Sequence, residues 1–242
     1  MASPGEPIFL DAGEAALVVE FGRTIEPAVH GRVLALDAAL SQRKLPGVVE
    51  LVPTIRSLMI HYDPLVIDRA ALVEAVRGLG TSATQTKPAR RWTIPCCYDP
   101  QFGEDIATVA QQLGMTSERV VALHSGATFQ AYMYGFLPGF CYLGGLPQAL
   151  TVPRRPTIRA PHPTGTIMIG AGMGLITTFS MPTGWWLVGR TPERMFSPAR
   201  QETFLAAVGD EIKFETIDVD TFNALDARAA AGEVVAKVAK RA

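Results

Sequence analysis

The chain has 242 residues, of which 48% are hydrophobic and 19% charged, with a formal net charge of −1 at pH 7. This length and composition are typical of a globular protein that forms one large domain or two small ones. The near-zero charge excludes the basic surface typical of proteins that bind nucleic acid.

The chain has three cysteines, Cys96, Cys97 and Cys141. Their number and spacing fit neither a disulfide framework nor a CxxC metal site. We therefore expect buried, reduced thiols and a cytoplasmic protein. The first 25 residues lack the basic segment and apolar run of a signal peptide. Gly or Pro interrupts the uncharged stretches 120–153 and 160–189 every few residues, so we interpret them as strands and turns rather than membrane spans.

The first third of the chain alternates between strand and helix patterns. The expected elements are two strands over 8–22, a helix over 26–44, two strands over 48–63 and a helix over 68–80. Pro27 suits the first turn of its helix. This order favours a small α+β domain, which we place at residues 1–84.

The polar segment 81–91 is the best candidate for a linker. A strand follows it, then helices over 104–113 and 117–124, the second of them capped by Thr116. Short strands and Gly/Pro turns continue to residue 217, which favours a mainly β barrel or sandwich over 85–217. The Ala-rich end, 218–242, predicts a helical tail that is solvated or contacts a partner.

The segment GAGMG at 170–174 superficially matches a dinucleotide-binding loop. That loop must open a helix, because the helix N-terminus holds the pyrophosphate. Here the β-branched stretch LITTFS follows, so we predict a β-hairpin turn. No Walker-type ATP loop is present in the sequence.

The segment MYGFLPGFCYLGGLP at 133–147 is unusually aromatic for a Gly/Pro-rich loop. We expect its rings to form a pocket or an interface, because exposed aromatics are unfavourable unless a partner covers them. Pro138 and Gly139 predict a type II turn with the glycine at positive φ. The candidate pocket or interface residues are Tyr134, Phe136, Pro138, Gly139, Phe140, Tyr142, Gly184 and Trp185.

Arginines flank these uncharged segments. Arg155, Arg159 and Arg190, and less strongly Arg154, are candidates to bind a carboxylate or phosphate through their planar forks. Ordinary solvated arginines at strand ends are the alternative. His124 is either a further anion contact or a side chain that caps the end of its helix. No second ligand stands at metal-binding spacing from His162, so we predict no metal site.

Three motifs in order, YGFLPGFCYLGGLPQAL, PRR and GWWLVGRTPERMFSP, make the chain resemble one known family. It contains the B-type subunit of 5-oxoprolinase, allophanate hydrolase subunit 1, the matching part of urea carboxylase and a Kip-type inhibitor of a histidine kinase. The resemblance runs from about residue 9 to 217. It implies a small α+β domain followed by a cyclophilin-like β-barrel. Departures from the family pattern, such as Cys141 in place of a proline, leave room for another substrate.

The resemblance implies a cytoplasmic subunit of an ATP-dependent complex, inactive alone, that opens the lactam of 5-oxoproline to glutamate. ATP and magnesium would be held wholly or partly by the partners. These would be a homologous partner, the C-type subunit of 5-oxoprolinase, and a lactam-opening subunit. Two alternatives remain open: a component of a urea carboxylase or allophanate hydrolase complex, and a non-catalytic kinase inhibitor. In each case the expected ligand is a small anionic amide or a protein, not nucleic acid or a membrane.

Overall fold

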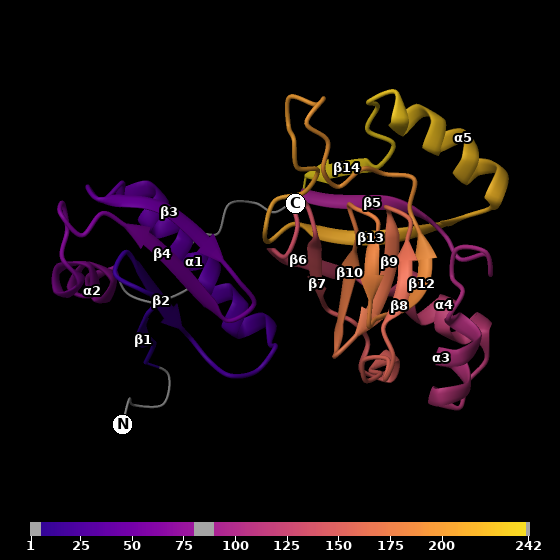
Figure 1. Ribbon diagram of the computed structural model, residues 1–242, viewed down its shortest axis with the longest axis horizontal. Coiled ribbons are helices and arrows are strands. Elements are labelled where there is room, and N and C mark those ends of the chain that lie inside the picture. Colours follow the sequence, from indigo (N-terminus) through magenta and orange to yellow (C-terminus); the bar gives the residue numbers. More distant parts are fainter. Residues whose placement is uncertain (1–5, 80–89, 241–242) are drawn as a thin grey trace. The chain divides into compact units, whose positions relative to one another are not determined.

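The computed structural model describes residues 6–79 and 90–240 (Figure 1). The chain divides into two compact units, residues 1–88 and 89–242. The domain boundary predicted at residue 84 and most of the predicted linker lie outside the described residues.

The N-terminal unit is a four-stranded antiparallel sheet with two helices. Its elements are β1 (Ile8–Asp11), β2 (Ala16–Glu20), α1 (Pro27–Arg43), β3 (Val48–Pro53), β4 (Ser57–Tyr62) and α2 (Arg69–Gly78). The strand order is β1-β2-β4-β3. The predicted order of elements is confirmed, and Pro27 stands in the first turn of α1.

Alternation along β4 shows why this sequence forms a strand with one buried face. Leu58 and Ile60 are fully buried, whereas the intervening Met59 is only partly so. They pack on Leu17, Leu36 and Leu72 from the neighbouring strand and the two helices. Asp68 begins α2 by accepting a hydrogen bond from the backbone N–H of Ala71 at 2.8 Å.

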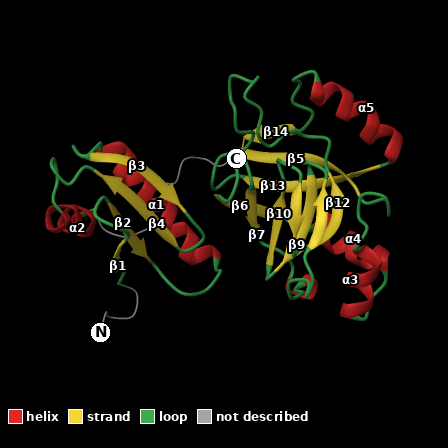
Figure 2. Ribbon diagram, in the orientation of Figure 1, coloured by secondary structure: helices red, strands yellow, loops and turns green. Residues whose placement is uncertain are grey.

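The C-terminal unit is a closed barrel with helices around it (Figure 2). Its elements are β5 (Arg90–Cys97), α3 (Ile106–Leu113), α4 (Ser117–Gly126), β6 (Phe129–Tyr134), β7 (Cys141–Gly144), the 3-10 turn η1 (Gln148–Leu150), β8 (Arg159–His162), β9 (Thr166–Gly170), β10 (Met173–Ile176), β11 (Met181–Thr183), β12 (Trp186–Arg190), β13 (Glu211–Ile217), α5 (Val219–Ala230) and β14 (Lys237–Lys240).

The barrel closes because β12, the first strand in the order β12-β9-β10-β7-β6-β13-β5, also pairs with β5. These strands form a ring. The strand β14 pairs with the part of β5 that β12 does not reach. Strands β8 and β11 form a separate pair. The core is filled by side chains such as Ile94, Leu143 and Ile167, all fully buried. The predicted mainly β architecture is therefore confirmed as a closed barrel.

Two local predictions in this unit are also confirmed. The glycine-rich segment 170–174 is a tight hairpin between β9 and β10, with Ala171 and Gly172 at φ of 50° and 78°. Thr116 caps α4 through its hydroxyl, which accepts from the backbone N–H of Arg119. Among the described residues, no helix has the length and apolar character needed to cross a bilayer.

The C-terminal tail differs from the prediction of a helix over 218–242. The helix α5 ends at Ala230, and Lys237–Lys240 form the strand β14 on β5. The reason is a distant carboxylate, because the fully buried Glu193 accepts the backbone N–H groups of Val235 and Ala236 at 2.7 and 2.6 Å. This contact holds the chain extended where its local composition favours a helix.

Candidate functional site

Two of the predicted arginines converge on one buried carboxylate. Arg155 Nη1 lies 2.9 Å and Arg159 Nη2 lies 2.5 Å from the same oxygen, Oδ1 of Asp105. Arg159 also pairs with Glu104. We call these four residues, Glu104, Asp105, Arg155 and Arg159, the arginine–carboxylate centre.

Three separate segments position this centre. Asp105 stands just before α3 and is held against β12, because its Oδ2 accepts from the backbone N–H of Leu187 at 2.9 Å. Arg155 follows η1, and its backbone N–H donates to the carbonyl of Gly184 at 2.8 Å. The Arg155 guanidinium also lies 4.8 Å from the centre of the Trp186 ring, a cation–π distance. Arg159 begins β8.

The centre retains unused hydrogen-bonding capacity. The Nε atoms of Arg155 and Arg159 are buried and have no hydrogen-bond partner within the described parts of the chain. The nearby His162 is buried, and at least one of its ring nitrogens lacks a partner there too. Burial lowers the pKa of His162; Arg159 lowers it further, whereas the Met181 carbonyl and Glu104 oppose the shift. Buried groups left unpaired in this way are typical of binding sites.

The structure buries the predicted anion contact His124 in the core of the C-terminal unit, between α4 and the barrel strands. Its ring is fully buried, stacks on Phe214 at 4.9 Å, and its Nδ1 and the hydroxyl of Tyr98 share a 2.8 Å hydrogen bond. Burial lowers the pKa of His124 to about 3. A neutral, enclosed imidazole is unsuited to binding an anion, and its burial between α4 and the strands β6 and β13 also differs from the position of a solvated helix cap.

Arg190 is not part of the arginine–carboxylate centre. Its guanidinium lies 5.7 and 5.3 Å from the ring centres of Phe102 and Phe222, and its Nε donates to the carbonyl of Thr164 at 3.0 Å. Because Phe222 belongs to α5, Arg190 helps to hold that helix on the barrel. Arg154 is exposed and lies 5.8 Å from the ring centre of Trp185.

The predicted aromatic loop lies among further rings from distant segments. Phe136 and Phe140 are 5.8 Å apart, Tyr134 contacts Phe204 at 5.3 Å, and Phe204 contacts Phe196 at 5.3 Å. Phe179 lies 6.2 Å from Phe196. We call this set the aromatic surface: Tyr134, Phe136, Phe140, Phe179, Phe196 and Phe204.

Three rings of the aromatic surface face solvent. Phe136 is 73% exposed, Phe204 43% and Phe179 41%, whereas Phe140 is buried. Phe136 also has φ of 72°, a backbone conformation that is unfavourable for a bulky residue. An aromatic ring held exposed on a strained backbone is a feature of contact surfaces rather than of a stable core.

The predicted turn at Pro138 and Gly139 fixes this loop. The N–H of Phe140 donates to the carbonyl of Leu137, and Gly139 has φ of 74°, as a type II turn requires. A Cβ on Gly139 would lie 2.2 Å from Cβ of Phe196, so only glycine fits. Thr178 Oγ1 donates to the Pro138 carbonyl and ties the turn to the segment that follows β10.

Tyr142, Gly184 and Trp185 form a second group beside the arginines. The Tyr142 and Trp185 rings meet edge-on, 6.1 Å apart. Trp185 is buried, and the carbonyl of Gly184 accepts from Arg155. Most of the predicted site residues therefore separate into the arginine–carboxylate centre with this group beside it, and the aromatic surface with the turn at Pro138 and Gly139. His124 and Arg190 belong to neither.

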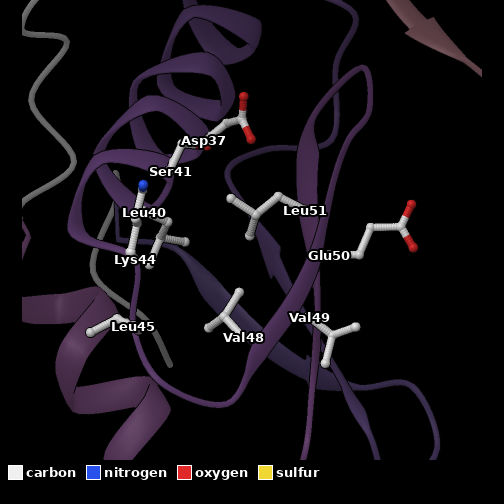
Figure 3. Close-up of a pocket in the computed structure, with 9 residues that line it drawn as sticks. All are labelled: Asp37, Leu40, Ser41, Lys44, Leu45, Val48, Val49, Glu50 and Leu51. Atoms are coloured by element: carbon white, nitrogen blue, oxygen red, sulfur yellow. The ribbon is translucent and has the colours of Figure 1, made fainter.

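An apolar hollow of about 450 Å³ opens between α3 and α4. Tyr98, Ile106 and Val121 line it, and Glu104 of the arginine–carboxylate centre lines it as well. A second groove, of about 480 Å³, lies between α1 and β3 in the N-terminal unit and has Lys44 and Glu50 among its lining residues (Figure 3). None of the predicted site residues lines either cavity. Within the described residues, no three His, Cys, Asp or Glu side chains are grouped to hold a metal ion.

Asp105 and Glu104 are the site residues that sequence reasoning missed. An acidic residue just before a helix is usually an N-cap. Asp105 makes no such cap, because both of its carboxylate oxygens are used by the arginines and Leu187. The one signal in the sequence was a pair of carboxylates at the start of a predicted helix. It did not identify the site, because the arginines that bind Asp105 lie about 50 residues further along the chain.

Comparisons with known proteins place the chain among carboxyltransferase-related proteins. Residues 7–206 match the family described as carboxyltransferase domain, subdomain C and D. The chain is 31% identical over 224 residues to the B-type subunit of 5-oxoprolinase from Bacillus subtilis, covering 88% of this chain and 93% of the relative. It is 32% identical over 206 residues to the B-type subunit of 5-oxoprolinase from Escherichia coli O157:H7, covering 84% of this chain and 92% of the relative.

Solved structures agree on the fold. The chain superposes on 84% of its length with the protein TTHA0988 at a TM-score of 0.74 and 31% identity, and spans 40% of that longer chain. It superposes on 97% of its length with Kluyveromyces lactis urea carboxylase at a TM-score of 0.76 and 16% identity, spanning 24% of that chain. The second likeness concerns the fold alone. The chain therefore belongs to the carboxyltransferase-domain family, in the part defined by subdomains C and D.

Proposed function

We propose that this chain is the B-type subunit of an ATP-dependent 5-oxoprolinase complex, which opens the lactam of 5-oxoproline to give glutamate. The observation that carries the proposal is the match to this 5-oxoprolinase subunit from several bacteria, which spans more than nine-tenths of two of these relatives. No observation on this chain favours the urea or kinase-inhibitor alternatives to the same degree.

The chemistry explains why such a reaction uses ATP. A lactam carbonyl is a poor electrophile. Transfer of the γ-phosphoryl group to the lactam oxygen makes that oxygen a good leaving group, so water can add to the carbon. The C–N bond then breaks as the ring nitrogen takes up a proton, which leaves an acyl phosphate. A second water hydrolyses this acyl phosphate to glutamate and inorganic phosphate. Cationic groups near the phosphate and the substrate carboxylate favour these steps.

We propose that the arginine–carboxylate centre binds the carboxylate of the substrate. Arg155 and Arg159 are the two cations that the fold brings together, and each retains an unpaired Nε donor. A charge-assisted bidentate contact is the mode in which a guanidinium recognises a carboxylate. ATP and magnesium belong, in this proposal, wholly or partly to partner subunits, since the sequence contains no phosphate-binding loop.

We propose that the aromatic surface contacts a partner, either the homologous C-type subunit or a lactam-opening subunit. Its three exposed rings come from three loops of the barrel, and the strained Phe136 is the most exposed of them. An interface core of this kind is typically aromatic and depleted of charge. Covering these rings would also remove a large apolar surface from water.

Co-expression with the neighbouring subunit genes tests the proposal. We expect a complex that hydrolyses ATP in the presence of 5-oxoproline and releases glutamate, whereas the chain alone does neither. Phe136→Ser should abolish co-elution with the partner. The matched control Ile158→Ser, at a side chain 78% exposed in the same unit, should not. Turnover of 5-oxoproline by the purified chain alone would contradict the proposal.

A further inference from the structure

The two carboxylates of the arginine–carboxylate centre differ in how firmly they are held. The Asp105 side chain is 4% exposed and is fixed by two arginines and the backbone of Leu187. The Glu104 side chain is 50% exposed and pairs with Arg159 alone among the arginines of the centre. Asp105 is therefore a permanent part of the centre, whereas Glu104 can leave at small cost, because exposed ion pairs contribute little to stability.

The charge balance of the centre makes this difference important. Arg155 and Arg159 carry two positive charges, and Asp105 and Glu104 carry two negative charges. A ligand carboxylate that joined all four would add an uncompensated negative charge at a partly buried site, which is unfavourable. If the ligand carboxylate takes the place of Glu104, the centre stays neutral and Arg159 keeps its partner.

The hollow beside α3 supplies a place for the rest of the ligand. Glu104 both lines this hollow and pairs with Arg159. The hollow therefore lies next to the Arg159 guanidinium, with only the Glu104 side chain between them. Ile106 and Val121 offer apolar contact for a small ring. A cavity of about 450 Å³ with mostly apolar walls and a few polar groups at its rim is typical of small-molecule sites.

We propose that Glu104 is an internal substitute for the ligand carboxylate: it occupies Arg159 until a carboxylate ligand displaces it, and the ligand ring then enters the hollow between α3 and α4. The inference rests on the proposed function, because it concerns the same arginine. It goes further by naming the contact that the ligand must break. It also makes an unusual prediction, namely that removing a site residue strengthens binding.

His162 provides a reporter at the site, because it lies close enough to both Arg159 and Glu104 to respond to their charges. The chain has four histidines, so isotope-labelled histidine gives few NMR signals, and His162→Gln identifies the relevant one. The full chain is titrated with 5-oxoproline, with acetate and with the neutral lactam 2-pyrrolidinone. The shift of the His162 signal gives the affinity without any need for catalysis.

We expect Glu104→Gln to bind 5-oxoproline roughly three- to tenfold more tightly than the unmodified chain, the scale of one exposed ion pair or hydrogen bond. Affinity for 2-pyrrolidinone should not change, because it has no carboxylate. The matched control Glu233→Gln removes a glutamate that is 52% exposed, pairs with Arg228 and does not line the hollow, so it should leave all affinities unchanged. Arg159→Ala added to Glu104→Gln should abolish the gain.

Three results would overturn the inference: equal or weaker 5-oxoproline binding by Glu104→Gln, an equal gain for 2-pyrrolidinone, or no His162 shift with any carboxylate in either form. Glu104→Ser serves as a second variant, with circular dichroism to verify its fold. Failure of the proposed function can be told apart from failure of this inference. A co-expressed complex that does not turn over 5-oxoproline would contradict the function, but the His162 shift on titration with acetate would remain. An active complex with no effect of Glu104→Gln would reject only the inference.

Discussion

Replacing His124 with phenylalanine should remove much of the acid sensitivity of the barrel unit. Burial lowers the pKa of His124 from 6.5 to about 3. The unfolded chain therefore takes up a proton near pH 6.5, while the folded chain does not until about pH 3. The free energy of unfolding is then fully retained above pH 6.5 and declines as the pH falls toward 3.

The size of this effect follows from the shift. Each pKa unit corresponds to about 1.4 kcal/mol, so the full decline attributable to His124 is on the order of 5 kcal/mol. A pH of 5 lies about 1.5 units below the pKa of the histidine in the unfolded chain. The free energy of unfolding is therefore about 2 kcal/mol lower at pH 5 than at pH 8. His124→Phe keeps a ring between Phe129 and Phe214 but cannot titrate.

Urea unfolding at pH 8 and pH 5 measures the difference. The three tryptophans, Trp92, Trp185 and Trp186, all lie in the C-terminal unit, so tryptophan fluorescence reports that unit alone. The substitution also removes a partner of the Tyr98 hydroxyl, which should lower stability by about 1–3 kcal/mol at both pH values. The comparison therefore depends on the change between pH 8 and pH 5. An equal decline in both proteins would refute the reasoning.

Three further outcomes are expected. Gly139→Val should lower the melting temperature and abolish partner co-elution, because its Cβ would collide with Phe196, whereas Gly172→Ala, with positive φ but open space, should show only a cost of about 1 kcal/mol; equal melting of the two variants would contradict this. Asp105→Asn should destabilise the chain by about 2–4 kcal/mol in urea unfolding, since it weakens a partly buried ion-pair cluster, and an unchanged midpoint would show that the cluster is not coupled to folding. Glu193→Gln should increase hydrogen exchange over 232–240, and unchanged protection there would show that β14 holds without this carboxylate.

Local patterns predict those elements whose structure depends on local interactions. The helix over Pro27–Arg43 and the alternating strand β4 follow from apolar periodicity, and the turn at Gly139 follows from the φ that only glycine adopts easily. The helix predicted over 218–242 is present as far as Ala230, but the prediction is wrong for the residues beyond it, where the Ala-containing composition still favours a helix. Glu193, more than 40 residues away, fixes these residues as a strand instead.

The site is predicted in part for a related reason. Two of the three proposed arginines do meet, because family-like motifs place Arg155 and Arg159 near each other in the sequence. Arg190 is grouped with them on charge alone, yet its position is decided by the rings of Phe102 and Phe222. Asp105 is not predicted as a site residue, because an ion pair with an arginine about 50 residues away leaves no periodic pattern in the sequence.

The strand β5 has a consequence for how the protein is made. It is the first strand of the barrel to leave the ribosome, but its neighbours β13 and β14 are the last. At 5–20 residues per second, synthesis of the intervening chain takes roughly 6 to 25 seconds, during which the ring cannot close. The rings of the aromatic surface come from segments made within that interval. A partner that recognises their assembled arrangement must therefore wait for the finished chain, so assembly of the complex is expected to follow translation rather than accompany it.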